Sequence, residues 1–216
     1  MNYASKITIC KGKPEEQVSL YFEITNIFSN FNSMNNLYFI AILPDQDLSA
    51  MIDGIRKECA HDHGVYAALK PPVHITLAPP FKLPSGMESQ LSESLKTACN
   101  FTPFVQKLEN FDGFPEHTIY IHAKKSGALT AVYNNLKSVL KLYNAAPKGQ
   151  LTPHITIAYR DAKEAYPKIM QQYKKRRLRA EFLVNHFTLL KHNGKYWDVL
   201  RDYYSSPGGE QLTMSL

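Results

Sequence analysis

Two short segments of the chain alternate strictly between polar and apolar side chains, and they are almost identical. Residues 74–78 read His-Ile-Thr-Leu-Ala, and residues 154–158 read His-Ile-Thr-Ile-Ala, 80 positions further on. Successive side chains of a β-strand point to opposite faces, so the histidine and threonine of each segment share one face, about 6.6 Å apart. Each segment therefore predicts a strand that buries one face and presents an imidazole and a hydroxyl on the other.

Helical periods of apolar residues occupy four other parts of the chain. The spacing of Leu48, Met51, Ile52, Ile55 and Cys59 predicts an inward-facing stripe of a helix that ends at Gly64. A helix over 87–99 is expected to turn Leu91, Leu95 and Cys99 inward. The clearest helix covers 127–143, and another over 162–178 is expected to carry a basic cluster despite Pro167 in its first turn.

Strand patterns fill the spaces between these helices. Strands are expected at 37–43, 72–78, 103–109, 117–123, 151–159, 181–191 and 195–200. Pro79-Pro80 is expected to break the second of them, and Asn193-Gly194 predicts a hairpin between the last two. The order divides into two halves, each with one motif strand and two helices. We therefore expect an α+β fold with two lobes, whose sheets pack back to back or form one concave surface with helices outside.

The domain boundaries follow from where this pattern starts and stops. Residues 34–204 are expected to form a single domain, and 205–216, which contain Pro207-Gly208-Gly209, a loose tail. Residues 1–33 read as a non-core extension, although 18–24 alternate well enough to add an edge strand. Met34 directly precedes the first strand and is an alternative start.

Composition excludes several classes of protein. The chain has 44% hydrophobic residues but no run of about 18, so no membrane span is expected, and no apolar segment follows the N-terminal lysines as in a secretory signal. Cys10, Cys59 and Cys99 have no metal-binding spacing and form no even disulfide set, which favours a reducing cytoplasm. The net charge of +6 mildly favours an anionic ligand, and a solvated helix end explains the basic run at 174–179 better than a specific RNA site does.

The two histidine and threonine pairs resemble the His-x-Thr-x signature of the two-histidine (2H) phosphoesterase superfamily. The longer forms, His-Ile-Thr-Leu-Ala-Pro-Pro-Phe and Pro-His-Ile-Thr-Ile-Ala-Tyr-Arg, are similar to its bacterial 2′-5′ RNA ligase, or RNA 2′,3′-cyclic phosphodiesterase, branch. Residues 37–44, 117–121 and 187–191 with Tyr196 resemble flanking strands of that branch, and the resemblance covers roughly 35–203. It implies two lobes related by a pseudo-two-fold axis, with antiparallel sheets and both motifs lining a central groove.

The resemblance implies a phosphodiesterase that opens 2′,3′-cyclic phosphates at RNA or nucleotide ends and, in reverse, a 2′-5′ RNA ligase. Histidine suits both proton transfers because its ordinary pKa is about 6.5. His74 and His154 are the expected acid–base pair, and Thr76 and Thr156 are expected to donate hydrogen bonds to phosphate oxygens. We take His154 as the base and His74 as the acid, although the motifs are too alike to distinguish them. The scheme needs no metal or other cofactor.

Four further residues are candidates for substrate binding. Arg160 follows the second motif and suits a phosphate, and Lys82 follows the first motif. Tyr120 and His122 share the polar face of the strand at 117–123 and are placed to touch a base or ribose. A surface charge explains Arg160 equally well, and surface or core packing is favoured for Lys82, Tyr120 and His122. Core packing is the default for Phe81 and Tyr159. His61-Asp62-His63 favours a helix end over a metal site.

Three functions remain open at this point. The first is the cyclic phosphodiesterase, acting on RNA ends or small nucleotides as a cytoplasmic monomer with no obligatory protein partner. The second is a related enzyme for a 2′-5′ oligoadenylate or a nucleotide-sugar cyclic phosphate. The third is a nucleotide- or RNA-binding module without turnover, which the two intact histidine–threonine pairs disfavour because binding alone needs no pair of titratable groups.

Overall fold

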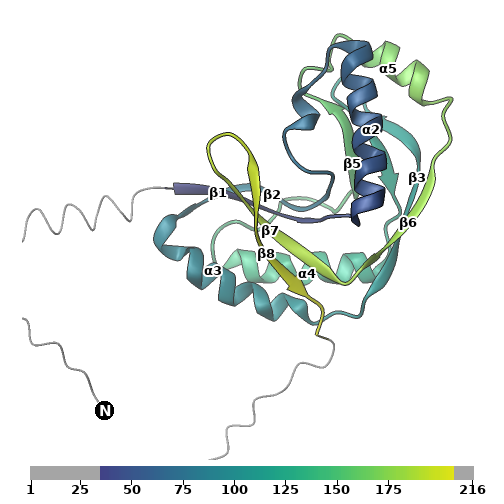
Figure 1. Cartoon of the computed structure of the whole chain (residues 1–216). Coiled ribbons are helices and arrows are strands. Elements are labelled where there is room, and N and C mark those ends of the chain that lie inside the picture. The colour runs from purple at the N-terminus through teal and green to yellow at the C-terminus, as the bar shows by residue number, and fades with distance from the viewer. Residues whose placement is uncertain (1–34, 207–216) are drawn as a thin grey trace, which may run out of the picture.

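A computed structural model describes residues 35–206 as one curled, eight-stranded antiparallel sheet with helices on its outer face (Figure 1). The strand order is β6-β3-β4-β5-β2-β1-β7-β8. The strands are β1 (Asn35–Ile42), β2 (Ile75–Pro84), β3 (Phe104–Phe114), β4 (Thr118–Ala123), β5 (His154–Tyr159), β6 (Arg179–Val184), β7 (His186–His192) and β8 (Trp197–Tyr204). The helices are α2 (Gln46–His63), α3 (Glu88–Leu95), α4 (Gly127–Lys141) and α5 (Tyr166–Tyr173), with 3-10 turns η1 (Ala67–Leu69), η2 (Ser85–Met87) and η3 (Lys96–Cys99).

The sheet consists of two four-stranded halves that meet at a single paired position. Strands β2 and β5 are adjacent, and Ile75 opposite Ile155 is their one paired position. On one side of this junction the order is β2-β1-β7-β8, and on the other it is β5-β4-β3-β6. The two orders correspond strand by strand, with one motif strand at the inner edge of each half. The predicted α+β fold with two lobes and a concave antiparallel surface is therefore confirmed.

Two helices, α2 and α4, pack on the lobe opposite to that of the strand that precedes them in sequence. Helix α2 follows β1 in sequence but packs against β5, and α5 contacts β3 and β4. Helices α3 and α4 lie together at the other lobe, where α4 contacts β2. Figure 1 shows α2 and α5 at one end of the molecule and α3 and α4 at the other. Each lobe thus has a motif strand and two helices, as expected, but the chain exchanges elements between the lobes.

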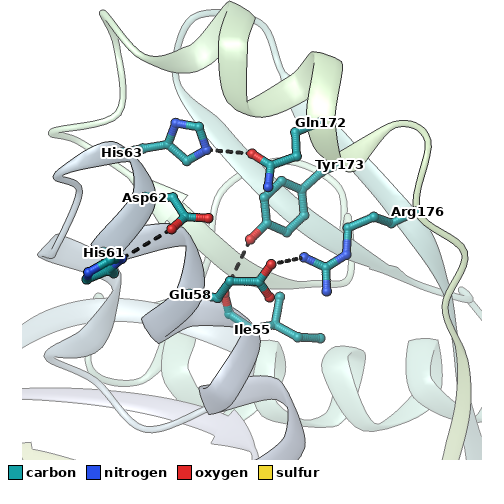
Figure 2. A network of polar contacts seen from close by, with 8 residues as sticks. All are labelled: Ile55, Glu58, His61, Asp62, His63, Gln172, Tyr173 and Arg176. Atoms are coloured by element: carbon teal, nitrogen blue, oxygen red, sulfur yellow. Dashed lines mark hydrogen bonds and ion pairs between the residues drawn. The ribbon is translucent and has the colours of Figure 1, made fainter.

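Polar contacts join α2 to α5 along the outer edge of the second lobe (Figure 2). The Tyr173 hydroxyl donates to the Ile55 carbonyl at 3.4 Å, and Arg176 Nη1 lies 2.9 Å from Glu58 Oε1. His63 Nε2 and Gln172 Oε1 are 2.8 Å apart. These contacts fix the helix that, as described below, supplies a buried arginine to the central cavity.

Helix ends follow the local sequence closely. Asp45 caps α2 by accepting the Leu48 N–H at 2.9 Å, and Gly64 ends it in the left-handed conformation at φ 68°. Ser126 caps α4, whose predicted apolar stripe is buried. Leu91, Leu95 and Cys99 also face the core as predicted. Met51 was placed in the inward stripe of α2 wrongly, because 44% of it is exposed.

Several predicted boundaries are wrong, including that of the strand expected at 103–109, which runs on to Phe114. Two of these errors have a clear physical reason. Strand β2 runs through Pro79-Pro80 to Pro84, because the prolines fall at an irregularity in the β1 pairing, beyond the one position where β5 pairs. Their missing N–H groups therefore interrupt no ladder. Helix α5 covers only Tyr166–Tyr173, so the basic run 174–177 follows the helix instead of lying on it. Pro167 suits the first turn of this shorter helix.

The predicted strand 181–191 is two strands with different partners. Strand β6 pairs with β3, and after Asn185 the chain continues as β7, which pairs with β1 in the other lobe. The hairpin at Asn193-Gly194 is confirmed, with His192 opposite Trp197 and Gly194 at φ 99°. Cys59 and Cys99 are free and buried, and Cys10, like the proposed extension 1–33, lies outside the described residues. None of the helices within 35–206 is long and apolar enough to cross a membrane.

Candidate active site

The single pairing between β2 and β5 brings the two motifs side by side. Ile75 and Ile155 point into the core, with 0% and 1% of their surface exposed. Their neighbours on each strand therefore point to the opposite, concave face. Because the strands are antiparallel, the register sets His74 across from Thr156, and Thr76 across from His154. The two histidines are diagonal neighbours, which in an antiparallel pair are separated by about 7–8 Å.

Both imidazoles are oriented by the same backbone contact. His74 Nδ1 lies 2.7 Å from the Pro72 carbonyl oxygen, and His154 Nδ1 lies 2.7 Å from the Thr152 carbonyl oxygen. Since a carbonyl only accepts, each Nδ1 carries the proton and donates it. In the neutral form, Nε2 of each ring is then the unprotonated nitrogen. Each histidine is thus held in the tautomer that can accept a proton at Nε2.

Burial keeps both imidazoles neutral in the free protein. It lowers the pKa of His74 from 6.5 to about 4, although the hydrogen bond to Pro72 opposes the change. The positive charge of Arg56 lowers this pKa further, as does that of His154 when His154 is protonated. Burial also lowers the pKa of His154, against its bond to Thr152. Desolvation disfavours the charged form, and a nearby cation does the same. The shift at His74 is the larger one.

Aromatic rings cover one side of each histidine and account for this burial. The Phe39 ring centroid lies 5.0 Å from that of His74, and Trp197 packs edge-on against Phe39 at 4.5 Å. At the other motif, Tyr120 and Phe114 lie 5.0 Å and 5.2 Å from His154. The two motifs are alike, but their surroundings come from different elements and are not equivalent.

The hydroxyls of the two motif threonines are available to form hydrogen bonds with a ligand. Thr76 and Thr156 are half-buried on the concave face, and neither hydroxyl has a hydrogen-bond partner among residues 35–206. A hydroxyl can donate one hydrogen bond, so each is able to donate to a bound anion. With two threonines on one diagonal and two histidines on the other, the arrangement suits a tetrahedral phosphate between the four side chains.

A cavity of about 480 Å³ opens on the concave face beside the first motif. Its volume lies within the usual range for a small-molecule site. His74, Thr76 and Thr156 line it, whereas His154 is not among the lining residues. The walls come from β1, α2, the segment after η1, the end of β5 and the β7–β8 hairpin, and the remaining lining residues are Leu37, Phe39, Arg56, Ala68, Lys70, Pro71, Pro72, Pro80, Tyr159, Arg160, His192, Gly194, Lys195 and Trp197.

The family model of the 2′-5′ RNA ligase superfamily matches the sequence over residues 44–195, well over half of the chain. The chain belongs to the 2′-5′ RNA ligase superfamily. This confirms the resemblance noted in the sequence. Among curated proteins none matches the chain.

Solved structures show the same fold. The Escherichia coli LigT structure with 3′-AMP has a TM-score of 0.57 and 20% identity, over 80% of this chain and 99% of LigT. The TT0787 protein of Thermus thermophilus has a TM-score of 0.55 and 19% identity, again over 80% and 99%. The LigT structure with ATP has a TM-score of 0.54 and 22% identity, over 81% and 99%. At these sequence identities, the structural similarity establishes only that this chain has the same fold as those proteins.

The substrate-binding candidates lie at different distances from the cavity of this superfamily member. Arg160 lines it, with a left-handed backbone (φ 61°) that turns the chain out of β5 and sets its guanidinium over the Tyr159 ring at 5.2 Å. Tyr120 is buried against His154. His122 is exposed and pairs with His154 across β4 and β5. Lys82 is exposed, pairs with Leu37, and does not line the cavity.

Several cavity residues carried no sequence signal. Arg56 and Lys70 come from a helix and a loop upstream of the first motif, and Lys195 and Trp197 come from the β7–β8 hairpin. Tyr159, assigned to the core from its sequence position, is half-buried and lines the cavity. Only the folded arrangement brings these elements together, and it gives the cavity four basic side chains with Arg160.

No group of three potential metal ligands of the histidine, cysteine or carboxylate type is found within 35–206. The His61-Asp62-His63 run lies at the end of α2, as expected. There His61 Nδ1 is 3.2 Å from Asp62, and His63 contacts Gln172 of α5 (Figure 2).

Proposed function

We propose that this protein is a phosphodiesterase that opens 2′,3′-cyclic phosphates at RNA or nucleotide ends by two-histidine acid–base catalysis. The observation that carries the proposal is the register of β2 and β5, which sets two histidines and two threonines around one position. Hydrolysis of a cyclic phosphodiester needs one group to take a proton from water and another to give one to the departing ribose oxygen. Two imidazoles on opposite sides of phosphorus meet both needs without a metal.

The different surroundings of the histidines support an assignment of roles opposite to the one taken from sequence. His74 has the more strongly lowered pKa, about 4, so its Nε2 is free to accept the proton of the attacking water. His154 is then the acid, and the negative charge of a bound phosphodiester favours its protonated form. As the water oxygen bonds to phosphorus, the bond to one ribose oxygen breaks and that oxygen takes the proton of His154. Thr76 and Thr156 donate to the non-bridging oxygens.

The basic lining of the cavity supports an anionic nucleotide as the ligand. Arg160 presents a planar guanidinium able to form two hydrogen bonds to phosphate, and Lys70 and Lys195 add positive charge. LigT, which shares the fold, has been crystallised with 3′-AMP, ATP, NADP+ and phosphate. With a 5′-hydroxyl in place of water as the nucleophile, the same ring opening releases the 3′-oxygen and forms a 2′-5′ linkage, which is the 2′-5′ RNA ligase reaction. We further propose that the protein works as a cytoplasmic monomer without a protein partner, and its buried free thiols suit that reducing compartment.

The test is hydrolysis of an RNA oligonucleotide ending in a 2′,3′-cyclic phosphate, in excess EDTA. Wild type is compared with the His74→Ala/His154→Ala double variant, and folding of both is checked by circular dichroism. Turnover by wild type alone supports the proposal, and the position of the product phosphate identifies the ribose oxygen that leaves. A folded wild type without turnover refutes it for this substrate. The same assay with a 2′-5′ oligoadenylate and a nucleotide-sugar cyclic phosphate then distinguishes another enzyme from a binding module.

A further inference from the structure

A buried arginine stands behind the first motif, and neither its sequence position nor the family signature marks it. Arg56 lies on α2 with 3% of its surface exposed, and it lines the cavity with His74. Burial lowers its pKa, and the nearby Asp53 carboxylate opposes that change. The guanidinium remains protonated, because arginine keeps its proton in proteins. A full positive charge is thus buried next to an imidazole.

The charge of Arg56 is only partly compensated. Its Nη1 lies 3.7 Å from Asp53 Oδ1, a long contact to a carboxylate that is one-third exposed. Its Nη2 donates to the Pro71 carbonyl at 2.9 Å. Its Nε is buried and has no partner within 35–206. Burying a charge with one donor unpaired costs free energy, so stability alone gives no reason for an arginine here.

The Pro71 contact links Arg56 to the orientation of His74. Pro71 is followed directly by Pro72, whose carbonyl accepts the His74 Nδ1–H. The rings of both prolines fix φ near −65°. A hydrogen bond that holds the Pro71 carbonyl therefore also restricts the orientation of the next carbonyl, that of Pro72. The chain of contacts therefore runs from α2 through two stiff residues to the imidazole that the proposed mechanism uses as its base.

We propose that Arg56 is a positioning residue for His74: it anchors the Pro71-Pro72 segment that orients the ring, and it places a positive charge on the same cavity. This rests on the proposed function, because it concerns the group assigned there as base. Arg56 lowers the pKa of His74 from the α2 side, in addition to burial. Other charged or titratable groups facing this region are His154 on β5, Lys70 after η1, Tyr159 and Arg160 at the end of β5, and His192 and Lys195 on the hairpin.

The pKa of His74 in the free protein tests this directly, by NMR titration of its ring protons. Arg56→Met and Arg56→Gln remove the charge, and Gln keeps a donor for the Pro71 carbonyl. Both are expected to raise the pKa of His74 from about 4 towards 6.5. Arg56→Lys keeps the charge and is expected to leave it low. If water entering an emptied site caused the rise, the lysine variant would show it too.

Arg176→Met is the matched control, because Arg176 also ties α2 in place, through Glu58, but does not line the cavity (Figure 2). It is expected to leave the pKa of His74 unchanged. On a cyclic phosphate, the acid limb of kcat/KM should move to higher pH in Arg56→Met and Arg56→Gln, with kcat lowered by about 10²-fold and KM changed less. Arg176→Met should leave the acid limb in place.

An unchanged pKa of His74 in a folded Arg56→Met or Arg56→Gln protein would overturn the proposal. So would a wild-type His74 that titrates near its ordinary 6.5, a measurement that stands even if neither variant folds. Because the titration needs no turnover, a wild type that is inactive on cyclic phosphates refutes the proposed function while the pKa comparison still decides the role of Arg56.

Discussion

The buried, neutral His74 should make this protein lose stability in mild acid, and the effect can be isolated. The pKa of His74 is about 4 in the folded chain against 6.5 for an unperturbed histidine. The unfolded chain therefore takes up a proton first as the pH falls. The contribution of neutral His74 to the free energy of unfolding is fully present above pH 6.5, and it is lost as the pH falls from there towards 4. A shift of this size corresponds to about 3 kcal/mol in total, of which about 2 kcal/mol is lost between pH 7.5 and pH 5.

The informative variant is His74→Asn. The asparagine amide can still donate to the Pro72 carbonyl from nearly the position of Nδ1, but it does not titrate. Urea unfolding at pH 7.5 and pH 5 gives the free energy of unfolding of wild type and variant. Wild type is expected to lose about 2 kcal/mol more than the variant, or about 1 M in urea midpoint for a typical slope of about 2 kcal/mol/M. Acid effects at other groups are common to both proteins and cancel in the difference.

His122→Asn serves as the control, because His122 pairs with the second motif but is exposed. Between pH 7.5 and pH 5, the His122→Asn variant should lose as much free energy of unfolding as wild type does. If His74→Asn also loses as much stability as wild type between the two pH values, His74 is not held neutral by the fold. The assignment of His74 as the base would then fall with it.

Three further predictions concern the same face of the molecule. Single His74→Ala and His154→Ala changes should each lower turnover about 10²- to 10⁴-fold, and the double variant should lose far less than the product, as steady-state kinetics will show; fully multiplicative losses would contradict a concerted pair. Thr76→Val should lower kcat about 10²-fold while Thr76→Ser retains most of it, and equal losses would deny the hydroxyl a role. Asp161→Ala should cost about 1–2 kcal/mol of stability in urea and raise KM, because Asp161 Oδ2 accepts two backbone N–H groups of the η1 segment at 2.7 Å and 2.9 Å; an unchanged KM would show that this segment does not shape the cavity.

Local patterns predicted the elements of this fold well, because each depends on neighbouring residues. The alternation of the two motifs gave both strands and the side on which their histidines lie. Gly64 predicted the end of α2, and Asn193-Gly194 predicted the hairpin. The family followed from the resemblance of the same motifs to its His-x-Thr-x signature, and the family model over residues 44–195 confirms it.

The errors arise where an element depends on a partner that is distant in sequence. Pro79-Pro80 looks like a strand break, but it lies where β2 has lost its second neighbour. The pattern over 181–191 alternates throughout, so it does not reveal that the chain changes partners at Asn185. Met51 fits the spacing of α2, but the curled sheet covers a narrower face of that helix than the spacing implies.

The candidate site divides in the same way. The motif residues lie close together in sequence, so the sequence alone identified them as candidates. Arg160 was identified as a candidate because it closely follows the second motif. Arg56 was not found, because an arginine at helical spacing normally reads as a solvated charge. Its burial depends on α2 crossing to pack on β5, which no local pattern encodes.

This crossing is also what makes two nearly identical motifs chemically different. Each histidine has the same backbone partner, two residues before it, so the motifs alone give both rings one orientation and one tautomer. Acid–base catalysis needs one ring neutral and the other protonated, so the difference must come from outside the motifs. Burial lowers the pKa of His74 most, and helix α2 adds the positive charge of Arg56, whereas the uncharged rings of Phe114 and Tyr120 lie against His154. In the proposed mechanism, the symmetric repeat thus sets the position of the phosphate, and the exchange of helices between the lobes gives the two histidines the different surroundings from which their roles are assigned.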